Sequence, residues 1–387
     1  MKAIVLGAGK IGRVIAQDLI KSNLFEKLTI ADISNEVIDE ALKFIGDGRV
    51  DGVILDASKY ENIAKAMQGY DIAIGALLHK YALDGIKAAI ENKINYVDLV
   101  GSYPEKRLVL DDDAKKSNVT IIPGCGVAPG LGNILIGYGT TFFDELEYGK
   151  IIVGGLPLHK DSPLEYKIVY AIQSVFGIID RKSKVLINGE VVEEETFSNL
   201  EYIEFPSPLG KCEAFLTDGL SYSIYTMKDK GFKRLEEKSV RYPGYVDKVK
   251  FLIQCGLLDN EPVNFKGQQI SPREFVLSIL EPKMRLGNDI DITVLRVEIT
   301  GKREDKKQKL VFDMMDFRDQ KTGITSMART TGYPCSIAVQ MIVRGIINEK
   351  GIIPPEIAFG TPERFKLLDE GLKTRGINID CKFFDIE

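Results

Sequence analysis

Histidine, cysteine and tryptophan are scarce in this chain of 387 residues, which has two histidines, five cysteines and no tryptophan. His79 and His159 are far apart, so neither a histidine-rich catalytic scheme nor a metal site is indicated. No CxxC pair occurs, and the odd number of cysteines predicts reduced thiols in the cytoplasm, without disulfides or zinc. Cys125 is a weak candidate nucleophile because the sequence places no histidine beside it.

Long apolar runs and charge of one sign are also absent. No apolar run approaches the ~20 residues of a membrane span, and the net charge of −5 comes from interspersed acids and bases. Membrane insertion and nucleic-acid binding are therefore not expected. The chain opens with the strand-like KAIVLG, so we expect no signal peptide and a cytoplasmic location.

The first third of the sequence alternates short apolar runs with helical patterns. Strands are expected at 2–6, 27–31, 50–55, 71–75, 95–99 and 119–123. Helices are expected between them at 10–22, 35–45, 59–68, 81–92 and 104–117. This alternation predicts βαβ units and a doubly wound parallel sheet of the Rossmann type, with its ligand at the carboxyl ends of the strands.

After Gly124 the pattern becomes mainly β. Asn188-Gly189 is a two-residue hairpin signal, and 292–317 resembles a second hairpin with a charged loop. Helices expected at 166–178, 245–257 and 272–281 would cover one face of an antiparallel sheet. Helical patterns at 333–349 and 362–375 are expected to return to the first domain.

We therefore expect an α/β chain of two domains, which its length and its hydrophobic fraction of 44% allow. The Rossmann domain would comprise 1–124 together with 329–387, and the α+β substrate domain would comprise 125–328.

The segment LGAGKIG places Gly7, Gly9 and Gly12 in the G-x-G-x-x-G spacing, between a predicted strand and a predicted helix. These glycines allow the tight turn, the approach of a pyrophosphate and the packing of the helix, whose N–H groups bind the phosphates. Asp32 follows the second strand about 20 residues on, as the dinucleotide fingerprint requires.

Asp32 would bind both ribose hydroxyls and repel a 2′-phosphate, so NAD is preferred over NADP, which Ser34 and Asn35 could still tolerate. Asp56 ends the third strand near the expected adenine, although a helix cap explains it equally well. The predicted cofactor-binding residues are Gly7, Gly9, Lys10, Ile11, Gly12, Asp32, Asp56, Ala76, Leu77 and Leu78.

Candidates for the chemistry follow the fourth and fifth strands, where the nicotinamide would lie. His79 and Lys80 come after strand four, and His79 is a candidate proton acceptor or a surface histidine. Asp98 ends strand five and is a candidate for orienting a substrate amine or for capping a turn.

Arg241 is the candidate in the second domain for binding a substrate carboxylate, because it lies in an otherwise apolar strand. A solvated arginine on the surface is the alternative. Other polar positions of this domain that could face a substrate are Glu165, Glu213, Thr217, Asp218 and Tyr222.

The chain resembles the saccharopine dehydrogenase family over residues 1 to about 350. The resemblance is carried, in order, by LGAGKIG with Asp32, NYVDL, VTIIPGCGVAPGLGNIL, GGLP (154–157), LEY (164–166), EAFLTDG (213–219), KSVRYPG (238–244) and MARTTGYP (327–334). Within the family, the chain is most similar to the lysine-oxidising members. Ala128-Pro129-Gly130 and Gly132 replace the acidic residues that saccharopine reductases usually carry in this loop.

The resemblance implies a dinucleotide-dependent oxidative deamination of the ε-amine of lysine, which gives a semialdehyde that cyclises. It also implies a homodimer, with the second domain supplying the dimer surface. Arg241 would then bind the carboxylate of the substrate, with Glu165 or Glu213 near its α-ammonium. The alternatives are a saccharopine or carboxynorspermidine-type reductase and a regulatory protein that senses NAD without turnover.

Overall fold

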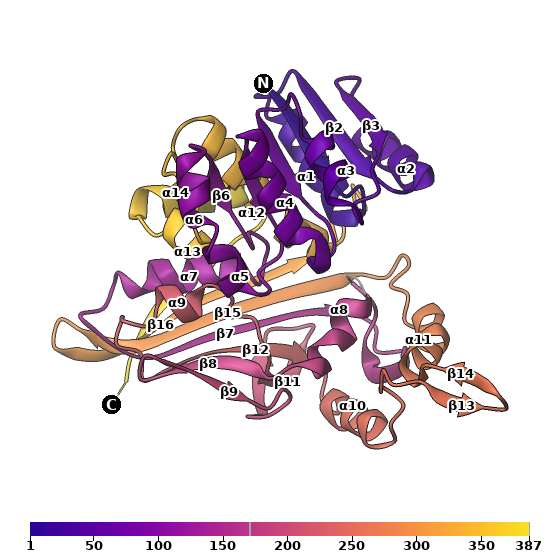
Figure 1. The fold of residues 1–387 in the computed structure, drawn as a ribbon. Coiled ribbons are helices and arrows are strands. Elements are labelled where there is room, and N and C mark those ends of the chain that lie inside the picture. The colour runs from indigo at the N-terminus through magenta and orange to yellow at the C-terminus, as the bar shows by residue number, and fades with distance from the viewer. Residues whose placement is uncertain (170–171, 387) are drawn as a thin grey trace.

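The structure of the chain, a computed structural model, describes residues 1–169 and 172–386. It contains a seven-stranded sheet flanked by helices, a nine-stranded sheet and a two-stranded sheet that projects from the second domain (Figure 1). The predicted α/β class, with a Rossmann sheet and a second mixed domain, is confirmed. No described helix combines the length and the apolar character that crossing a membrane requires.

The first sheet is parallel throughout and follows the order β17-β6-β5-β4-β1-β2-β3. Its order reverses between β1 and β4, which places a ligand crevice at the carboxyl ends of these strands. The predicted strands of the first domain are all present. The strands are β1 (Lys2–Leu6), β2 (Lys27–Asp32), β3 (Val50–Ile54), β4 (Ile72–Gly75), β5 (Asn95–Asp98), β6 (Thr120–Ile122) and β17 (Gly351–Ile352).

Of the four helices α1 to α4, α2 has both a side-chain cap at its start and a left-handed glycine at its end. In α2 the Ser34 hydroxyl accepts a hydrogen bond from the N–H of Val37, and Gly46 ends the helix with a φ of 65°. Helix α1 packs against α2, and α3 packs against α4. The helices are α1 (Lys10–Lys21), α2 (Asn35–Ile45), α3 (Tyr60–Ala66) and α4 (Ala82–Asn92), preceded by the short η1 (His79–Tyr81).

The single helix predicted over 104–117 is wrong, because the chain forms α5 (Pro104–Leu108) and α6 (Asp111–Lys116) instead. Val109 between them is exposed. The run Asp111–Asp113 occupies the first turn of α6, where acidic side chains are stabilised by the helix dipole. This run therefore favours a new helix start over continuation of α5.

The second sheet follows the order β10-β11-β12-β7-β15-β16-β18, with β8 paired to β12 and β9. It is antiparallel except between β12 and β7, which the long connection between these two strands makes possible. The strands are β7 (Glu145–Pro157), β8 (Ser183–Ile187), β9 (Glu190–Glu194), β10 (Glu201–Phe205), β11 (Gly210–Leu216), β12 (Arg234–Arg241), β15 (Asp291–Arg303), β16 (Lys306–Phe317) and β18 (Asp380–Asp385).

Both predicted hairpins are confirmed. Asn188 and Gly189 connect β8 to β9, and both have a positive φ, as a type I′ turn requires. β15 pairs with β16 along its whole length, and Glu304 and Asp305 form the charged turn. Figure 1 shows that β7, β15 and β16 pass beneath the first domain.

The helices of the second domain match the predictions unevenly. α10 (Tyr245–Gln254) and α11 (Pro272–Lys283) are close to their predicted ranges. The helix predicted at 166–178 starts later, as α8 (Ile172–Gly177), and its residues 170 and 171 lie outside the described part of the chain. The other elements are η2 (Pro163–Glu165), η3 (Ile178–Asp180), α7 (Leu131–Thr140), α9 (Ser223–Thr226), β13 (Val263–Phe265) and β14 (Gln268–Ile270).

The C-terminal part of the chain returns to the first domain and then leaves it. α12 (Ser326–Val343) packs against α1, and β17 extends the first sheet beside β6. α13 (Pro355–Ala358) and α14 (Pro362–Lys373) follow. The expectation that 329–387 belongs to the first domain is wrong for β18, because β18 pairs with β16 in the second sheet.

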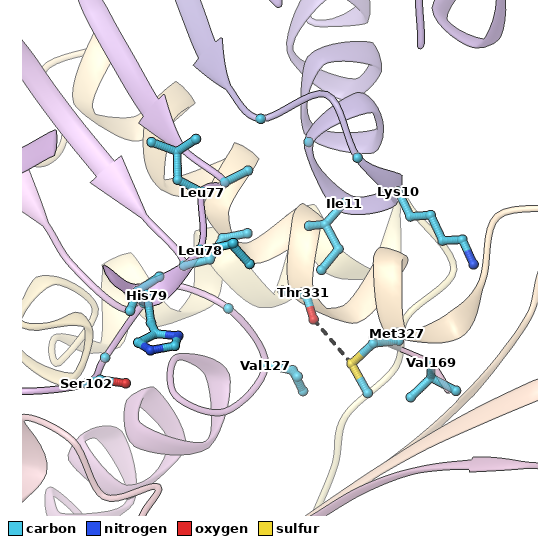
Figure 2. A pocket seen from close by; sticks show the side chains of 18 of the residues that line it. Lys10, Ile11, Leu77, Leu78, His79, Ser102, Val127, Val169, Met327 and Thr331 are labelled. Atoms are coloured by element: carbon cyan, nitrogen blue, oxygen red, sulfur yellow. Dashed lines mark hydrogen bonds between the residues drawn. The ribbon is translucent and has the colours of Figure 1, made fainter. Parts of the chain in front are cut away.

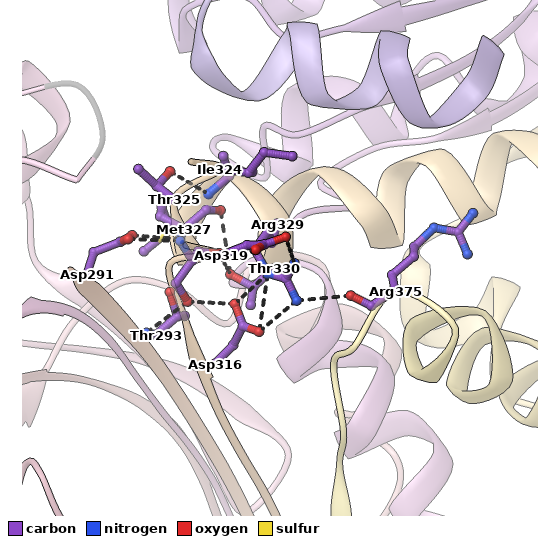
Figure 3. Close-up of polar contacts among 12 residues, drawn as sticks. Asp291, Thr293, Asp316, Asp319, Ile324, Thr325, Met327, Arg329, Thr330 and Arg375 are labelled. Atoms are coloured by element: carbon purple, nitrogen blue, oxygen red, sulfur yellow. Dashed lines mark hydrogen bonds and ion pairs between the residues drawn. The ribbon is translucent and has the colours of Figure 1, made fainter. Parts of the chain in front are cut away.

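α12 begins before its predicted start at residue 333, because a polar cluster fixes its first turn to β15 and β16 (Figure 3). The carboxylate of Asp291 accepts hydrogen bonds from the N–H groups of Ser326 and Met327, both at 2.9 Å. Asp316 accepts from the Ser326 hydroxyl at 2.9 Å and from Nε of Arg329 at 3.1 Å. The helix that covers the first domain is thereby anchored to the second sheet.

Candidate active-site cleft between the two domains

The loop after β1 has the geometry that a dinucleotide phosphate requires. Gly7 has a φ of 105°, and a side chain there or at Gly12 would collide with the backbone of Ala76 or of Gly7. A Cβ at Gly9 would meet only open space. No side chain caps the start of α1, so its first N–H groups are available to phosphate oxygens. These residues fit the predicted dinucleotide.

Asp32 is held at the end of β2 beside this loop. Its carboxylate accepts hydrogen bonds from the N–H of Ala8 at 2.9 Å and from the N–H of Ser34 at 3.3 Å. The Ser34 hydroxyl caps α2 and is therefore engaged. The carboxylate thus faces the crevice as an acceptor for ribose hydroxyls, which supports the predicted preference for NAD.

A cleft of about 940 Å³ lies between the two domains. Figure 2 shows Lys10, Ile11, Leu77 and Leu78 on its first-domain side, with Met327 and Thr331 of α12 across from them. All the predicted cofactor-binding residues line it, namely Gly7, Gly9, Lys10, Ile11, Gly12, Asp32, Asp56, Ala76, Leu77 and Leu78. Asp56 also accepts a hydrogen bond from the N–H of Ser58, which lowers its pKa, so it has the turn-capping role as well.

Arg241 lines the cleft from the end of β12, although it is buried. Its guanidinium lies over the ring of Tyr166, 4.6 Å from the centroid, and 5.4 Å from that of Tyr245. Nη1 donates to the carbonyl oxygen of Val240 at 2.7 Å. The aromatic contacts hold the guanidinium plane in a fixed orientation at the cleft, as carboxylate recognition requires.

Glu237 is a cleft residue that the sequence analysis missed. It lies four residues before Arg241 on β12, on the same face, together with Ser239. Its side chain is 3% exposed, and burial raises its pKa to about 7. The period of two along the strand, counted back from Arg241, was the signal that could have found it.

Thr217 lies behind this face, outside the lining of the cleft. Its hydroxyl donates to Oε2 of Glu237 at 2.5 Å and lies 3.0 Å from the hydroxyl of Ser239. Asp218 is half-buried and approaches Arg181 at 3.3 Å, away from the cleft lining. Thr217 can therefore orient Glu237, but the structure gives it no direct access to a substrate.

The other predicted substrate residues do not line the cleft. Glu213 accepts from the N–H groups of Gly244 and Val246 at 2.8 and 2.7 Å and so holds the turn after Arg241. Glu165 forms an ion pair of 2.9 Å with Lys248. Tyr222 is buried in an apolar cluster that consists mainly of first-domain residues. Sequence patterns identified these residues as polar but could not tell which way they point.

The three predicted catalytic residues are separated. His79 lines the cleft and is exposed (Figure 2). Lys80 lies outside the cleft lining, with Nζ 4.8 Å from the ring centroid of Tyr81. Asp98 is buried behind the lining, and its Oδ1 accepts from the N–H groups of Val100 and Gly124, both at 2.9 Å. Burial raises the pKa of Asp98 although Arg107 lies 3.7 Å away.

Asp98 therefore positions the loop 99–102, whose residues line the cleft, and does not itself reach a substrate in this structure.

Cys125 is buried, and burial raises the pKa of its thiol, which disfavours a nucleophilic thiolate. Nδ1 of His159 lies 2.5 Å from Oδ1 of Asp289. Within the described residues, no group of three or more potential ligands could hold a metal ion.

Comparisons with known proteins cover both domains. Residues 3–122 match the family model described as saccharopine dehydrogenase NADP binding domain, and residues 126–377 match saccharopine dehydrogenase C-terminal domain. The carboxyaminopropylagmatine dehydrogenase of Synechocystis sp. is 23% identical, over 96% of each chain. The glutamate-forming saccharopine dehydrogenase of Saccharomyces cerevisiae is 22% identical, over 78% of this chain and 83% of its own.

The fold is shared with a solved structure, that of apo saccharopine dehydrogenase (L-Glu forming) from Saccharomyces cerevisiae. The two chains superpose with a TM-score of 0.79, at 19% identity and with 99% of each chain covered.

Proposed function

The chain belongs to the saccharopine dehydrogenase family, and on that premise we propose that it is an NAD-dependent L-lysine 6-dehydrogenase. It would oxidise the carbon that carries the ε-amine of lysine, and water would convert the imine to the semialdehyde, which cyclises. The family and the dinucleotide-binding domain make it a nicotinamide-dependent oxidoreductase. The choice of lysine rests on the substrate side of the cleft.

The charge on that side of the cleft is the observation that carries the proposal. Among the described lining residues of the second domain, Arg241 is the one cation, and Glu237 and Glu281 are the carboxylates. Lysine has a single carboxylate and two amines, so one guanidinium and adjacent carboxylates complement it. Saccharopine has several carboxylates and would need more cations than this wall offers.

The cofactor would be held by the glycine loop and Asp32, and when bound it supplies the acceptor for hydride. The chain's own task is to bind the substrate with its reacting carbon near the ends of β4 and β5 and to take up a proton. The ε-ammonium must lose that proton before its carbon can give up hydride. His79 on the first-domain side and Glu237 on the second line the cleft and are the groups that we propose for this proton.

A reductase that forms a secondary amine is the second candidate. It is favoured by the Synechocystis relative, whose name denotes a substrate of that kind and which matches over 96% of each chain. The alternative of a sensor without turnover is less consistent with an open cleft of about 940 Å³ between the domains.

The test is a substrate panel followed by absorbance of NADH. L-Lysine with NAD is expected to give lysine-dependent NADH, and saccharopine is expected to give none. Activity with saccharopine or a carboxylated polyamine, and none with lysine, would reverse the order of the two candidates. The assay uses only the wild-type protein, so differences between its results reflect the substrates and not the effect of a substitution.

A further inference from the structure

One face of β12 presents Glu237, Ser239 and Arg241 to the cleft in sequence order. Four residues of strand separate the two charged groups, which is ~13 Å between their Cα atoms. The guanidinium of Arg241 lies over Tyr166 and Tyr245, at the carboxyl end of the strand. Glu237 lies four residues earlier, so the two ends of an extended substrate would meet opposite charges at different places along this wall.

The surroundings of Glu237 fix its carboxylate in place. Thr217 donates to Oε2 at 2.5 Å, and a Cβ on Gly219 would lie 2.6 Å from that same oxygen. The carboxylate therefore occupies space that exists only because residue 219 is glycine. Among the described residues, the hydrogen bonds that hold this carboxylate come from neutral donors, and its charge interacts with that of Arg241 on the same strand. A buried carboxylate held in this way at the wall of a cleft is suited to receive the ammonium of a substrate.

The segment behind Glu237 also connects it to the reacting side of the cleft. Ser221, at the end of the turn that begins with Thr217, donates through its hydroxyl to the carbonyl oxygen of Gly101 at 2.7 Å. Gly101 follows β5 and lines the cleft. The carboxyl end of β5 is where the nicotinamide half of a dinucleotide lies in this fold. Glu237 thus lies on the side of Arg241 that is nearer to the expected position of the nicotinamide.

We infer that Glu237 receives the reacting ammonium of the substrate and accepts its proton, while Arg241 binds the carboxylate at the other end. The substrate class is then an extended amine with a carboxylate at its far end, for which the four-carbon stem of lysine is one example. This inference rests on the proposed function for the identity of the reaction, but its binding component does not depend on turnover.

The step is balanced as follows. An N–H bond of the ammonium breaks, and the proton forms an O–H bond on the Glu237 carboxylate. NAD, when bound, would supply the acceptor for the hydride that leaves the amine carbon. The nitrogen lone pair would then form the C=N bond of an iminium, which water would hydrolyse to the aldehyde and ammonium. Glu237 returns its proton to solvent or to the departing ammonia before the next turnover.

The titration of Glu237 is consistent with this role. Its pKa is raised to about 7, chiefly by burial and also by Asp218, while Thr217, Arg241 and the N–H of Gly219 lower it and so limit the rise. A base with a pKa near the working pH accepts a proton readily and also releases it. Burial disfavours the charged carboxylate, whereas the positive charge of an arriving ammonium would favour its ionised form.

The test compares Glu237→Gln with Glu236→Gln, a matched control on the opposite face of the same strand. Glu236 accepts hydrogen bonds from Arg234 and Asn199 and lies outside the cleft lining. Calorimetry in the presence of NADH measures the binding of L-lysine, 6-aminohexanoate, which lacks the α-amine, and norleucine, which lacks the ε-amine. Affinity for NADH and the melting temperature check that each variant is folded.

We expect Glu237→Gln to weaken lysine and 6-aminohexanoate by about 10- to 100-fold, the loss typical of a charged hydrogen bond, and to leave norleucine unchanged. Equal weakening of norleucine would overturn the inference, because Glu237 would then hold the α-ammonium. Wild-type protein that binds neither lysine nor 6-aminohexanoate would overturn it too. Glu237→Asp keeps a carboxylate and is expected to recover part of the affinity if Glu237→Gln unfolds.

Kinetics separate this inference from the proposed function. We expect Glu237→Gln to lower kcat by about 10²- to 10⁴-fold and to remove the acidic limb of the pH profile. If the wild type oxidises lysine and Glu237→Gln keeps both kcat and that limb, or if His79→Gln removes the limb instead, Glu237 is not the base and the function stands. If the wild type binds lysine through Glu237 without forming NADH, the proposed function fails and the binding role stands.

Discussion

At the scale of single residues, we expect Asp32 and Arg241 to decide which dinucleotide and which substrate the cleft accepts. Asp32 presents a carboxylate where the adenosine ribose would lie, and Arg241 presents a guanidinium fixed by two aromatic rings. Both residues were predicted from the sequence because each belongs to a local pattern. Glu237 was not predicted, although it lies at even spacing from Arg241 on the same strand, because the sequence does not show that this face of β12 meets the cleft. The pairing of β12 with β7 and β11 decides that.

Asp32 should control the choice between NAD and NADP. Asp32→Ala removes the acceptor for the ribose hydroxyls and the charge that repels a 2′-phosphate. We expect the ratio of kcat/KM for NAD over NADP to fall by about 10- to 100-fold, as for loss of a charged hydrogen bond. Asp32→Asn retains an acceptor for the N–H of Ala8 and is the control for loop structure. An unchanged ratio in both variants would refute the assignment.

Arg241 should act on substrate binding more than on cofactor binding. Arg241→Lys keeps the positive charge but loses the planar guanidinium that lies over Tyr166. We expect the KM for lysine to rise by about 10-fold or more in Arg241→Ala and by less in Arg241→Lys, with the KM for NAD little changed. Steady-state kinetics measure both constants. An unchanged KM for lysine in Arg241→Ala would remove the carboxylate role.

Glu237 should also make stability depend on pH. Its pKa is raised from 4.5 to about 7 in the folded chain, so the folded state binds the proton more tightly than the unfolded state. The resulting stabilisation is fully present below pH 4.5 and is lost as the pH rises through about 7. We expect the free energy of unfolding of the wild type, relative to Glu237→Gln, to fall by about 3 kcal/mol across this range. Urea unfolding at several pH values measures it, and parallel curves for the two proteins would contradict the shift.

At the scale of helices and strands, local sequence signals predicted most elements and long-range contacts decided the rest. The strand–helix alternation of the first domain and the Asn188-Gly189 turn are local, and these predictions are confirmed. The start of α12 depends on Asp291 and Asp316, which belong to the strands β15 and β16 and not to the helix itself. The pairing of β18 with β16 likewise has no local signal.

The polar anchor of α12 is expected to be a major contributor to stability. Arg329→Met leaves the buried carboxylate of Asp316 without its guanidinium partner, which typically costs about 3–5 kcal/mol. Chemical denaturation measures the loss. The double variant Asp316→Leu with Arg329→Met removes both charges and is expected to recover part of it. A single variant as stable as the wild type would show that the cluster in Figure 3 is not an anchor.

At the scale of the whole molecule, α12 holds the two domains together, because it packs against α1 and β5 of the first domain and against β15 and β16 of the second. The cleft lies between the domains and is lined by residues of both. The sequence predicted the glycine loop, Asp32 and the residues after β4 on the first-domain wall, but it did not predict the loop 99–102, which also lines the cleft. Of the charged residues on the second-domain wall it predicted Arg241 and missed Glu237 and Glu281, because the facing of side chains there depends on the register of distant strands. The homodimer and the domain limits at 124 and 328 stay predictions.

The most direct measurement of the central claim follows the hydride itself. L-Lysine carrying deuterium at both hydrogen positions of the ε-carbon is incubated with the protein and NAD, and the reduced cofactor and the released ammonia are analysed by mass spectrometry and by enzymatic assay. The account predicts deuterated NADH and ammonia in equal amounts. Reduced cofactor without deuterium, or no reduction with lysine while a carboxylated secondary amine is oxidised, would contradict it.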